Sequence, residues 1–225
     1  MIIKLNFISN KIELYLLLKK RFLLIILTII FPHYVLFAQQ KDMPSKNIDI
    51  VMDIDNNEYN VRNIGTQLWM GKNLKVTHFN NGDSIENVKD SKKWINYNTG
   101  AWAHYDNNRI YDNSYGKLYN WYVINDSRGV CPTGWRIPKV SDWEILLKYL
   151  ETNLDPVGLS IIGGGCRSGE NGDFLYSGDD SYFWIYDNNS IVYGWNRDML
   201  PNGAGMYRQG VLKTDGYSIR CIKNN

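Results

Sequence analysis

The strongest periodic pattern in the sequence predicts an amphipathic helix over residues 138–150. Ser141 and Glu144 have the spacing of a capping box, in which a hydroxyl and a carboxylate satisfy the free amides of the first turn. Apolar residues recur at the i, i+3, i+4 and i+7 positions that form one helix face, namely Trp143, Leu146, Leu147 and Leu150. A helix with one apolar face must pack against a partner layer, and the rest of the chain has to supply it.

Short segments of alternating apolar residues predict strands on both sides of this helix. Residues 48–54 and 59–64 flank an Asx-rich turn and predict a β-hairpin, and residues 67–70 predict a further buried strand. Later strands are predicted between Gly, Asp and Asn turns, at residues 174–176, 182–186, 191–193, 206–212 and 217–222. These patterns predict an α+β domain in which short helices pack on small antiparallel sheets.

The middle of the chain, residues 80–114, has little periodicity and predicts long ordered loops packed by Trp94 and Trp102. Residues 112–114 can cap a short helix over residues 115–124. In that helix a buried face would be formed by Leu118, Trp121 and Tyr122. The Gly run at residues 163–165 lacks the Lys-Ser/Thr of a phosphate-binding loop, so we interpret it as tight β packing.

A secretory signal is predicted at the N-terminus. Basic residues 19–21 precede an apolar run, residues 22–37, and Ala38 is a small residue at the candidate cleavage point. The apolar run is short for a membrane span of about 20 residues. We expect a signal peptide over residues 1–38, a flexible lead-in over residues 39–47 and one domain over residues 48–225. A retained anchor is the alternative.

The charge distribution argues against nucleic acid as a partner. The chain has 225 residues with 25 Lys and Arg and 23 Asp and Glu, but five of those cations and one acid lie in the predicted leader. The remainder carries 20 basic and 22 acidic residues, so it has no net positive charge to attract phosphate backbones. All eight Trp and 14 of the 16 Tyr also lie in this remainder, which excludes disorder as the main state.

Several motifs occur in a fixed order over residues 48–223. They are YNVRNIGTQLWMGKNL (59–74), YGKLYNWYVI (115–124), VCPTGWRIPKVSDWEILL (130–147), GGGCRSGENGDF (163–174), YFWIY (182–186) and GYSIRCIK (216–223). In combination, this series resembles the Fibrobacter succinogenes major paralogous domain. Lys72 departs from the pattern, which has an acidic residue there, and Cys166 stands where an aromatic residue is usual.

The resemblance implies a C-type-lectin-like fold, distantly similar to formylglycine-generating sulfatase-modifying domains. In such folds the two chain ends pair as strands around a loop-rich excursion. Export permits a disulfide, and three cysteines allow one pair with one thiol left over. Since Cys166 departs from the family pattern, the resemblance implies a Cys131–Cys221 bridge.

The sequence offers no recognisable catalytic or metal site, so we expect neither an enzyme nor a cofactor. His78 and His104 are isolated in the sequence, no G-x-S-x-G is present, and the cysteine pair of the formylglycine-generating enzymes is missing near the C-terminus. Residues 53–57 superficially resemble a calcium loop but lack its Gly at position six and its acid at position twelve. Asp83-Ser84-Ile85 resembles a bacterial O-glycosylation acceptor, although a motif this short also occurs by chance.

Aromatic side chains in polar segments are the candidate ligand-binding residues, because sugar faces stack on Trp and Tyr rings. A second candidate is the segment 195–198, which resembles the Trp-Asn-Asp calcium strand of lectins with an inserted Arg. The candidates are Trp94, Tyr97, Trp102, Tyr105, Tyr111, Trp195, Asn196 and Asp198. For the aromatic residues, internal packing of a loop-rich fold is the alternative.

We therefore expect a secreted or cell-surface, non-catalytic interaction module. Its partner would be a glycan or an envelope protein, and it would meet the membrane only through export or surface association. A structural accessory subunit of a cell-surface complex is one alternative. An enzyme related to the formylglycine-generating oxidases is the other.

Overall fold

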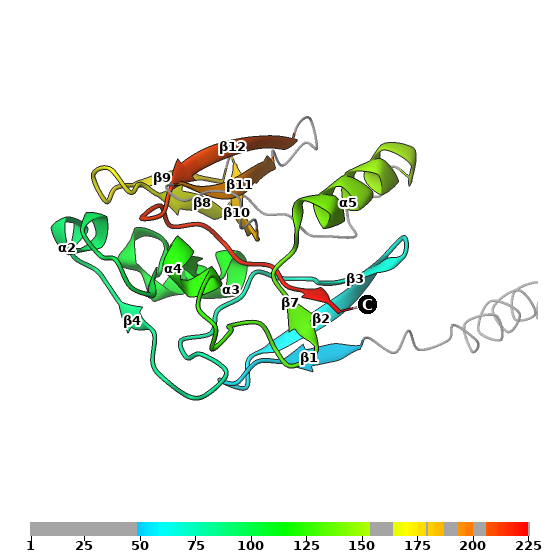
Figure 1. Cartoon of the computed structure of the whole chain (residues 1–225), viewed down its shortest axis with the longest axis horizontal. Coiled ribbons are helices and arrows are strands. Elements are labelled where there is room, and N and C mark those ends of the chain that lie inside the picture. Colours follow the sequence, from blue (N-terminus) through cyan, green and yellow to red (C-terminus); the bar gives the residue numbers. More distant parts are fainter. Residues whose placement is uncertain (1–48, 154–163, 179, 187–192, 200–205, 225) are drawn as a thin grey trace, which may run out of the picture. The chain divides into compact units, whose positions relative to one another are not determined.

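The opening hairpin and the last strand of the chain lie in one five-stranded sheet (Figure 1). Every pairing in this sheet is antiparallel. Across the sheet the strands are β1 (Ile50–Met52), β2 (Glu58–Ile64), β3 (Gln67–Met70), β13 (Ile222–Lys223) and β7 (Trp135–Arg136). The predicted hairpin and buried strand are confirmed, and the expected pairing of the two ends of the domain is present.

This arrangement comes from a computed structural model, which describes residues 49–153, 164–178, 180–186, 193–199 and 206–224. The predicted signal peptide and the whole of the predicted lead-in fall outside these residues. None of the described helices combines the length and the apolar character needed to cross a bilayer.

A second sheet is built from the later strands. Their order is β12 (Met206–Leu212), β11 (Tyr193–Met199), β10 (Ser181–Ile185), β8 (Gly164–Arg167) and β9 (Phe174–Ser177). A small third sheet joins β4 (Glu86–Asn87), β5 (Ala101–Ala103) and β6 (Leu118–Tyr119). The pairings are mostly antiparallel, but β10 with β8 and β4 with β5 are parallel. The second and third sheets are therefore mixed, whereas the sequence predicts antiparallel sheets.

Helix α5 (Val140–Asn153) has the predicted apolar face. Trp143 and Leu146 are fully buried, and the Trp143 ring lies 5.0 Å from that of Trp69 on β3 and 5.4 Å from that of Phe183 on β10. One buried cluster thus joins α5 to residues of both five-stranded sheets. The two sheets thus supply the partner layer that the periodicity of the helix requires.

The start of α5 differs from the predicted capping box. The helix begins at Val140, and it is the carboxylate of Asp142 that accepts the Lys139 amide, at 2.7 Å. Arg136 holds the same carboxylate through both of its terminal nitrogens, at 2.5 and 2.9 Å. Glu144 is exposed. The ion pair with Arg136, six residues earlier, selects Asp142 for this role, which the capping-box spacing of Ser141 and Glu144 does not indicate.

The helix predicted over residues 115–124 is wrong. The chain instead forms α3 (Asp112–Tyr115), then β6, then α4 (Trp121–Ile124). Gly116 ends α3 with φ of 73°, a left-handed conformation that favours glycine, and a Cβ there would lie 2.7 Å from the Cβ of Asn73. The next residues then use their backbone groups to pair with β5.

One further helix and two 3₁₀ turns interrupt the segment predicted as loops. They are α2 (Ser91–Ile95), η2 (Tyr105–Asn107) and η3 (Arg109–Tyr111). As predicted, Trp94 and Trp102 are buried within this segment. Residues 80–114 are thus short elements joined by ordered turns.

The predicted disulfide is present between Cys131 and Cys221, whose Cα atoms lie 5.9 Å apart. Cys221 is fully buried, as are Tyr217 and Ile219 on the same face of the terminal segment. Cys166 is buried on β8, outside this bridge. The segment before α5 is therefore covalently joined to the end of the chain, where the amide of Met70 donates to the Cys221 carbonyl at 3.0 Å.

Candidate functional site

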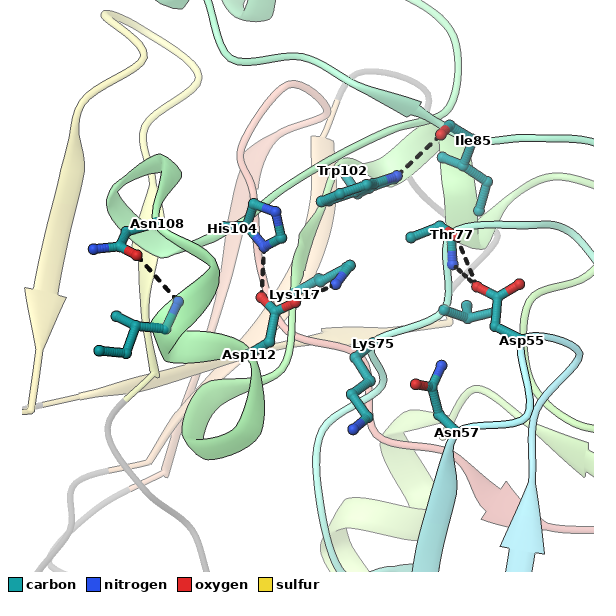
Figure 2. Close-up of polar contacts among 12 residues, drawn as sticks. Asp55, Asn57, Lys75, Thr77, Ile85, Trp102, His104, Asn108, Asp112 and Lys117 are labelled. Carbon is teal, nitrogen blue, oxygen red and sulfur yellow. Dashed lines mark hydrogen bonds and ion pairs between the residues drawn. The ribbon is translucent and has the colours of Figure 1, made fainter.

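A polar cavity of about 470 Å³ lies beside the turn of the opening hairpin. Its walls come from the hairpin turn, from the segment after β3, and from β5 with the segment that joins it to β6. Figure 2 shows the polar contacts on its walls, which include two aspartates. The volume falls within the range of small-molecule sites in proteins.

The first wall is organised around Asp55. One carboxylate oxygen accepts the amide and the hydroxyl of Thr77, at 2.5 and 2.8 Å, and the other lies 2.6 Å from Nδ1 of His78. Burial would raise the pKa of Asp55, but the hydrogen bonds from Thr77 and His78 outweigh it, and the pKa lies below its ordinary value. Asp55 is therefore an ionised acceptor that fixes the orientation of the His78 ring.

The position of Asp55 follows from the hairpin turn. The carboxylate of Asp53 accepts the amides of Asp55 and Asn57, at 3.0 and 2.9 Å, which is the Asx-turn chemistry that the sequence indicates. Asn56 takes the left-handed conformation with φ of 62°. Tyr59 donates its hydroxyl to Asp53 at 2.6 Å and accepts the Lys75 amide at 3.0 Å, so the turn is fixed to the segment after β3.

The second wall is organised around Asp112 at the start of α3. One carboxylate oxygen lies 2.5 Å from Nδ1 of His104, and the other accepts Nζ of Lys117 at 2.5 Å. The Lys117 ammonium also lies 4.7 Å from the centre of the Trp102 ring, and the His104 ring meets the same ring edge-on. The Trp102 indole is held by a 3.0 Å hydrogen bond to the Ile85 carbonyl (Figure 2). These contacts make the second wall rigid and mostly buried.

Among the predicted ligand-binding residues whose side chains the structure describes, only Trp102 lines this cavity. Trp94 is 1 % exposed and packs under the guanidinium of Arg167, so it contributes to the core. Tyr97 is half-buried, and its hydroxyl donates to the carboxylate of Glu86 on β4. The structure therefore does not bring Trp94 or Tyr97 to the cavity.

Tyr105 and Tyr111 lie in a separate aromatic cluster. Their rings are 5.7 Å apart and edge-on, and Tyr115 stacks on Tyr111. Both are half-buried and do not line the cavity. The Tyr105 ring also lies 5.5 Å from that of Phe174 on β9, so both tyrosines pack against other aromatic rings.

The other three predicted ligand-binding residues lie on β11. Trp195 pairs with Ile185, Asn196 with Trp184 and Asp198 with Tyr182 in the antiparallel ladder. Their side chains lie outside the described part of the structure. Within the described residues, no group of three or more His, Cys, Asp or Glu side chains forms a metal site.

The sequence interpretation missed the two histidines. It treated His78 and His104 as isolated, whereas each ring is bonded to an aspartate. Asp55 precedes His78 by 23 residues, and His104 precedes Asp112 by eight, so no local motif joins either pair. The only indication in the sequence was the density of Asn and Asp in these segments.

The cavity presents groups suited to recognition. With Nδ1 bound to a carboxylate oxygen, each imidazole has Nε2 left to accept or donate a hydrogen bond. Asn57, Asn113, Lys75 and Arg109 complete the lining. The Thr77 hydroxyl, which could otherwise act as a nucleophile, donates to Asp55.

Comparison with known proteins adds one finding. The family model of the Fibrobacter succinogenes major domain matches residues 63–158. The matched segment includes β3, α5, Cys131 and most of the cavity lining, whereas Asp55 and Asn57 precede it. No curated protein and no solved structure matches the chain.

Proposed function

The chain belongs to the Fibrobacter succinogenes major domain family, and from this premise we propose that it is an exported, non-catalytic module that binds carbohydrate in the polar cavity. The observation that carries the proposal is that two Asp–His contacts and the Trp102 ring lie on the walls of one cavity. Sugars present hydroxyls that both donate and accept, and their faces pack on aromatic rings.

The cavity chemistry favours binding over turnover. Both carboxylates that line it are already engaged, Asp55 by Thr77 and His78, and Asp112 by His104 and Lys117. A glycosidase requires one carboxyl free to protonate the leaving group and a second to act on the other face of the sugar. Carboxylates that hydrogen bonds already hold in place suit a preorganised binding site instead.

We also propose a C-type-lectin-like fold for the domain. Two features support it, namely the pairing of β13 with β3 and the long excursion of short elements between them. The Cys131–Cys221 bridge engages the only C-terminal thiol, which argues against chemistry of the formylglycine-generating type. We propose that binding needs no calcium.

The proposed location is extracellular, either secreted or at the cell surface, and it rests on the leader at residues 1–38. Expression in a bacterial host with export tests it directly. Recovery of a chain beginning at Gln39 outside the cytoplasm is expected, and an intact leader in the cytoplasmic fraction would contradict the proposal.

A glycan array probed with the exported chain tests the binding function. The His78→Gln and Asn113→Ala variants change exposed parts of the cavity wall, and Asn98→Ala changes an exposed side chain outside it. We expect binding that survives calcium chelation, weakens in the first two variants and is unchanged in the third. Uniform absence of binding to the array would defeat the proposal.

A second candidate function is a structural subunit of a cell-surface complex. The observation that favours it is the edge strand β1, where Ile50 and Met52, with Ile54 just beyond, are 55 %, 57 % and 41 % exposed. Exposed apolar side chains on a sheet edge can dock a partner. Co-purification of a stoichiometric envelope protein, lost on the Ile50→Ser/Met52→Ser double substitution, would support this function.

A further inference from the structure

Two cationic side chains line the cavity without an ionic partner in the described part of the chain. Lys75 and Arg109 make no ion pair with any residue that the structure describes, and in Figure 2 no dashed line reaches the Lys75 ammonium. Lys117, the third cation of the lining, is bound to Asp112. Lys75 and Arg109 come from different walls, the first from the segment after β3 and the second from η3.

The remaining groups of the lining do not neutralise these cations. The lining contains two carboxylates and three cations, which gives a formal charge of +1 with both histidines neutral. Asp112 is bound by His104 and Lys117, and Asp55 by Thr77 and His78. The two carboxylates therefore already accept hydrogen bonds from protein groups, whereas the positive charges of Lys75 and Arg109 are available to a ligand.

This positive charge is local to the cavity. The chain after the predicted leader has 20 basic and 22 acidic residues, so a polyanion gains nothing from the net charge of the protein. An anionic group in the cavity would instead contact the compact charge of the Lys75 ammonium and the planar guanidinium of Arg109, whose N–H groups donate hydrogen bonds. Arginine in particular binds carboxylate and sulfate-like oxygens in a bidentate manner.

We propose that the ligand is an anionic saccharide, one that carries a carboxylate or a sulfate, and that Lys75 and Arg109 bind its charged group. This inference rests on the proposed carbohydrate-binding function and specifies the ligand class. Trp102 and the two Asp–His pairs would contact the neutral part of the sugar. Carboxylated and sulfated sugars share the required chemistry, and the test separates them.

Isothermal titration of the exported chain provides the test. The probes are an oligogalacturonate and its carboxyl-reduced neutral counterpart, and a sulfated galacto-oligosaccharide and its desulfated counterpart. We expect one acidic probe to bind about 10-fold more tightly than its neutral partner, because each charge-assisted contact is worth on the order of one decade in affinity. The affinity for the acidic probe should fall as salt is raised.

Charge-removing variants identify the residues responsible. Lys75→Gln and Arg109→Gln should each lower the affinity for the acidic probe about 10-fold and leave the neutral probe unchanged. Lys92→Gln is the matched control, because Lys92 is exposed on α2 and outside the cavity, and it should alter affinity by less than about twofold. Unchanged thermal unfolding of all three variants is expected, since neither cavity cation forms an ion pair with a described residue.

The outcomes separate this inference from the function on which it rests. Equal affinity for acidic and neutral probes, or losses in Lys92→Gln as large as in Lys75→Gln, would overturn the anionic ligand and leave carbohydrate binding intact. If neither these probes nor the sugars of the array bind, the proposed function fails as well.

Discussion

Nδ1 of His104 lies 2.5 Å from Oδ1 of Asp112, and this pair fixes the loop between β5 and α3 as one wall of the cavity. The side chains of both residues are 12 % exposed, and Lys117 on the other carboxylate oxygen is 7 % exposed. A carboxylate shared by two nearly buried partners is a structural requirement as well as part of the candidate site. Its removal should therefore be costly.

We predict that Asp112→Ala lowers the free energy of unfolding by about 3 kcal/mol, because it leaves the Lys117 ammonium buried without a counter-charge. Urea denaturation followed by tryptophan fluorescence measures the loss. Asp83→Ala is the control, since that carboxylate is 56 % exposed and its partner Arg128 keeps Asp126, so stability should hardly change. Equal losses in the two variants would show that the Asp112 contacts contribute no more than a surface pair.

The Cys131–Cys221 bridge should be a major source of stability. It closes a loop of 90 residues, for which the chain-entropy relation gives roughly 4–5 kcal/mol. We expect the urea midpoint of the oxidised protein to fall sharply when dithiothreitol is added. The Cys166→Ala variant keeps the bridge and should show the same fall, whereas a Cys131→Ser/Cys221→Ser variant should show none. A fall that disappears in Cys166→Ala would assign the bridge to another pair.

Asp142 should make stability sensitive to acid. Burial would raise its pKa, but the hydrogen bonds from Arg136 and from the Lys139 amide outweigh it and place the pKa below the ordinary 3.8. Because the folded-state pKa is lower than the unfolded one, this contribution is fully present above about pH 5 and is lost as the pH falls through the folded pKa.

We therefore predict that Asp142→Asn is less stable than the wild type near neutral pH and that the difference narrows on acidification. Urea unfolding of both proteins across about pH 7 to pH 3 provides the comparison. Asp83→Asn serves as the exposed control, and its unfolding curve should follow the wild type more closely throughout. A constant difference between wild type and Asp142→Asn at every pH would contradict this prediction.

Gly165 should resist substitution for reasons of space as well as conformation. It has φ of +61°, and an added Cβ would lie 2.3 Å from the Leu175 carbonyl oxygen on the neighbouring strand. We expect Gly165→Ala to lower the free energy of unfolding by roughly 3 kcal/mol. Gly134→Ala isolates the conformational part, because Gly134 has φ of +81° with open space around it, and should cost roughly 1 kcal/mol. Similar losses in the two variants would show that the contact with the Leu175 carbonyl oxygen does not contribute.

The sequence alone determined those features whose physical cause lies within a few residues. The Asx turn of the hairpin and the apolar face of α5 follow from local hydrogen bonding and from helical spacing, and both are present. The disulfide was implied by resemblance to a family, since three cysteines by themselves leave the pairing open. Burial of Trp94 and Trp102 likewise followed from the need to pack a loop-rich segment.

Only the tertiary structure decided the rest, because the relevant partners are distant in the chain. Gly116 fits against Asn73, 43 residues earlier, and ends α3 where periodicity extended a helix. The cavity itself exists because the hairpin turn places Asp55 beside His78, 23 residues later, opposite the Asp112 wall. Periodicity and propensity act over a few residues, whereas a binding site depends on which segments the sheets bring together.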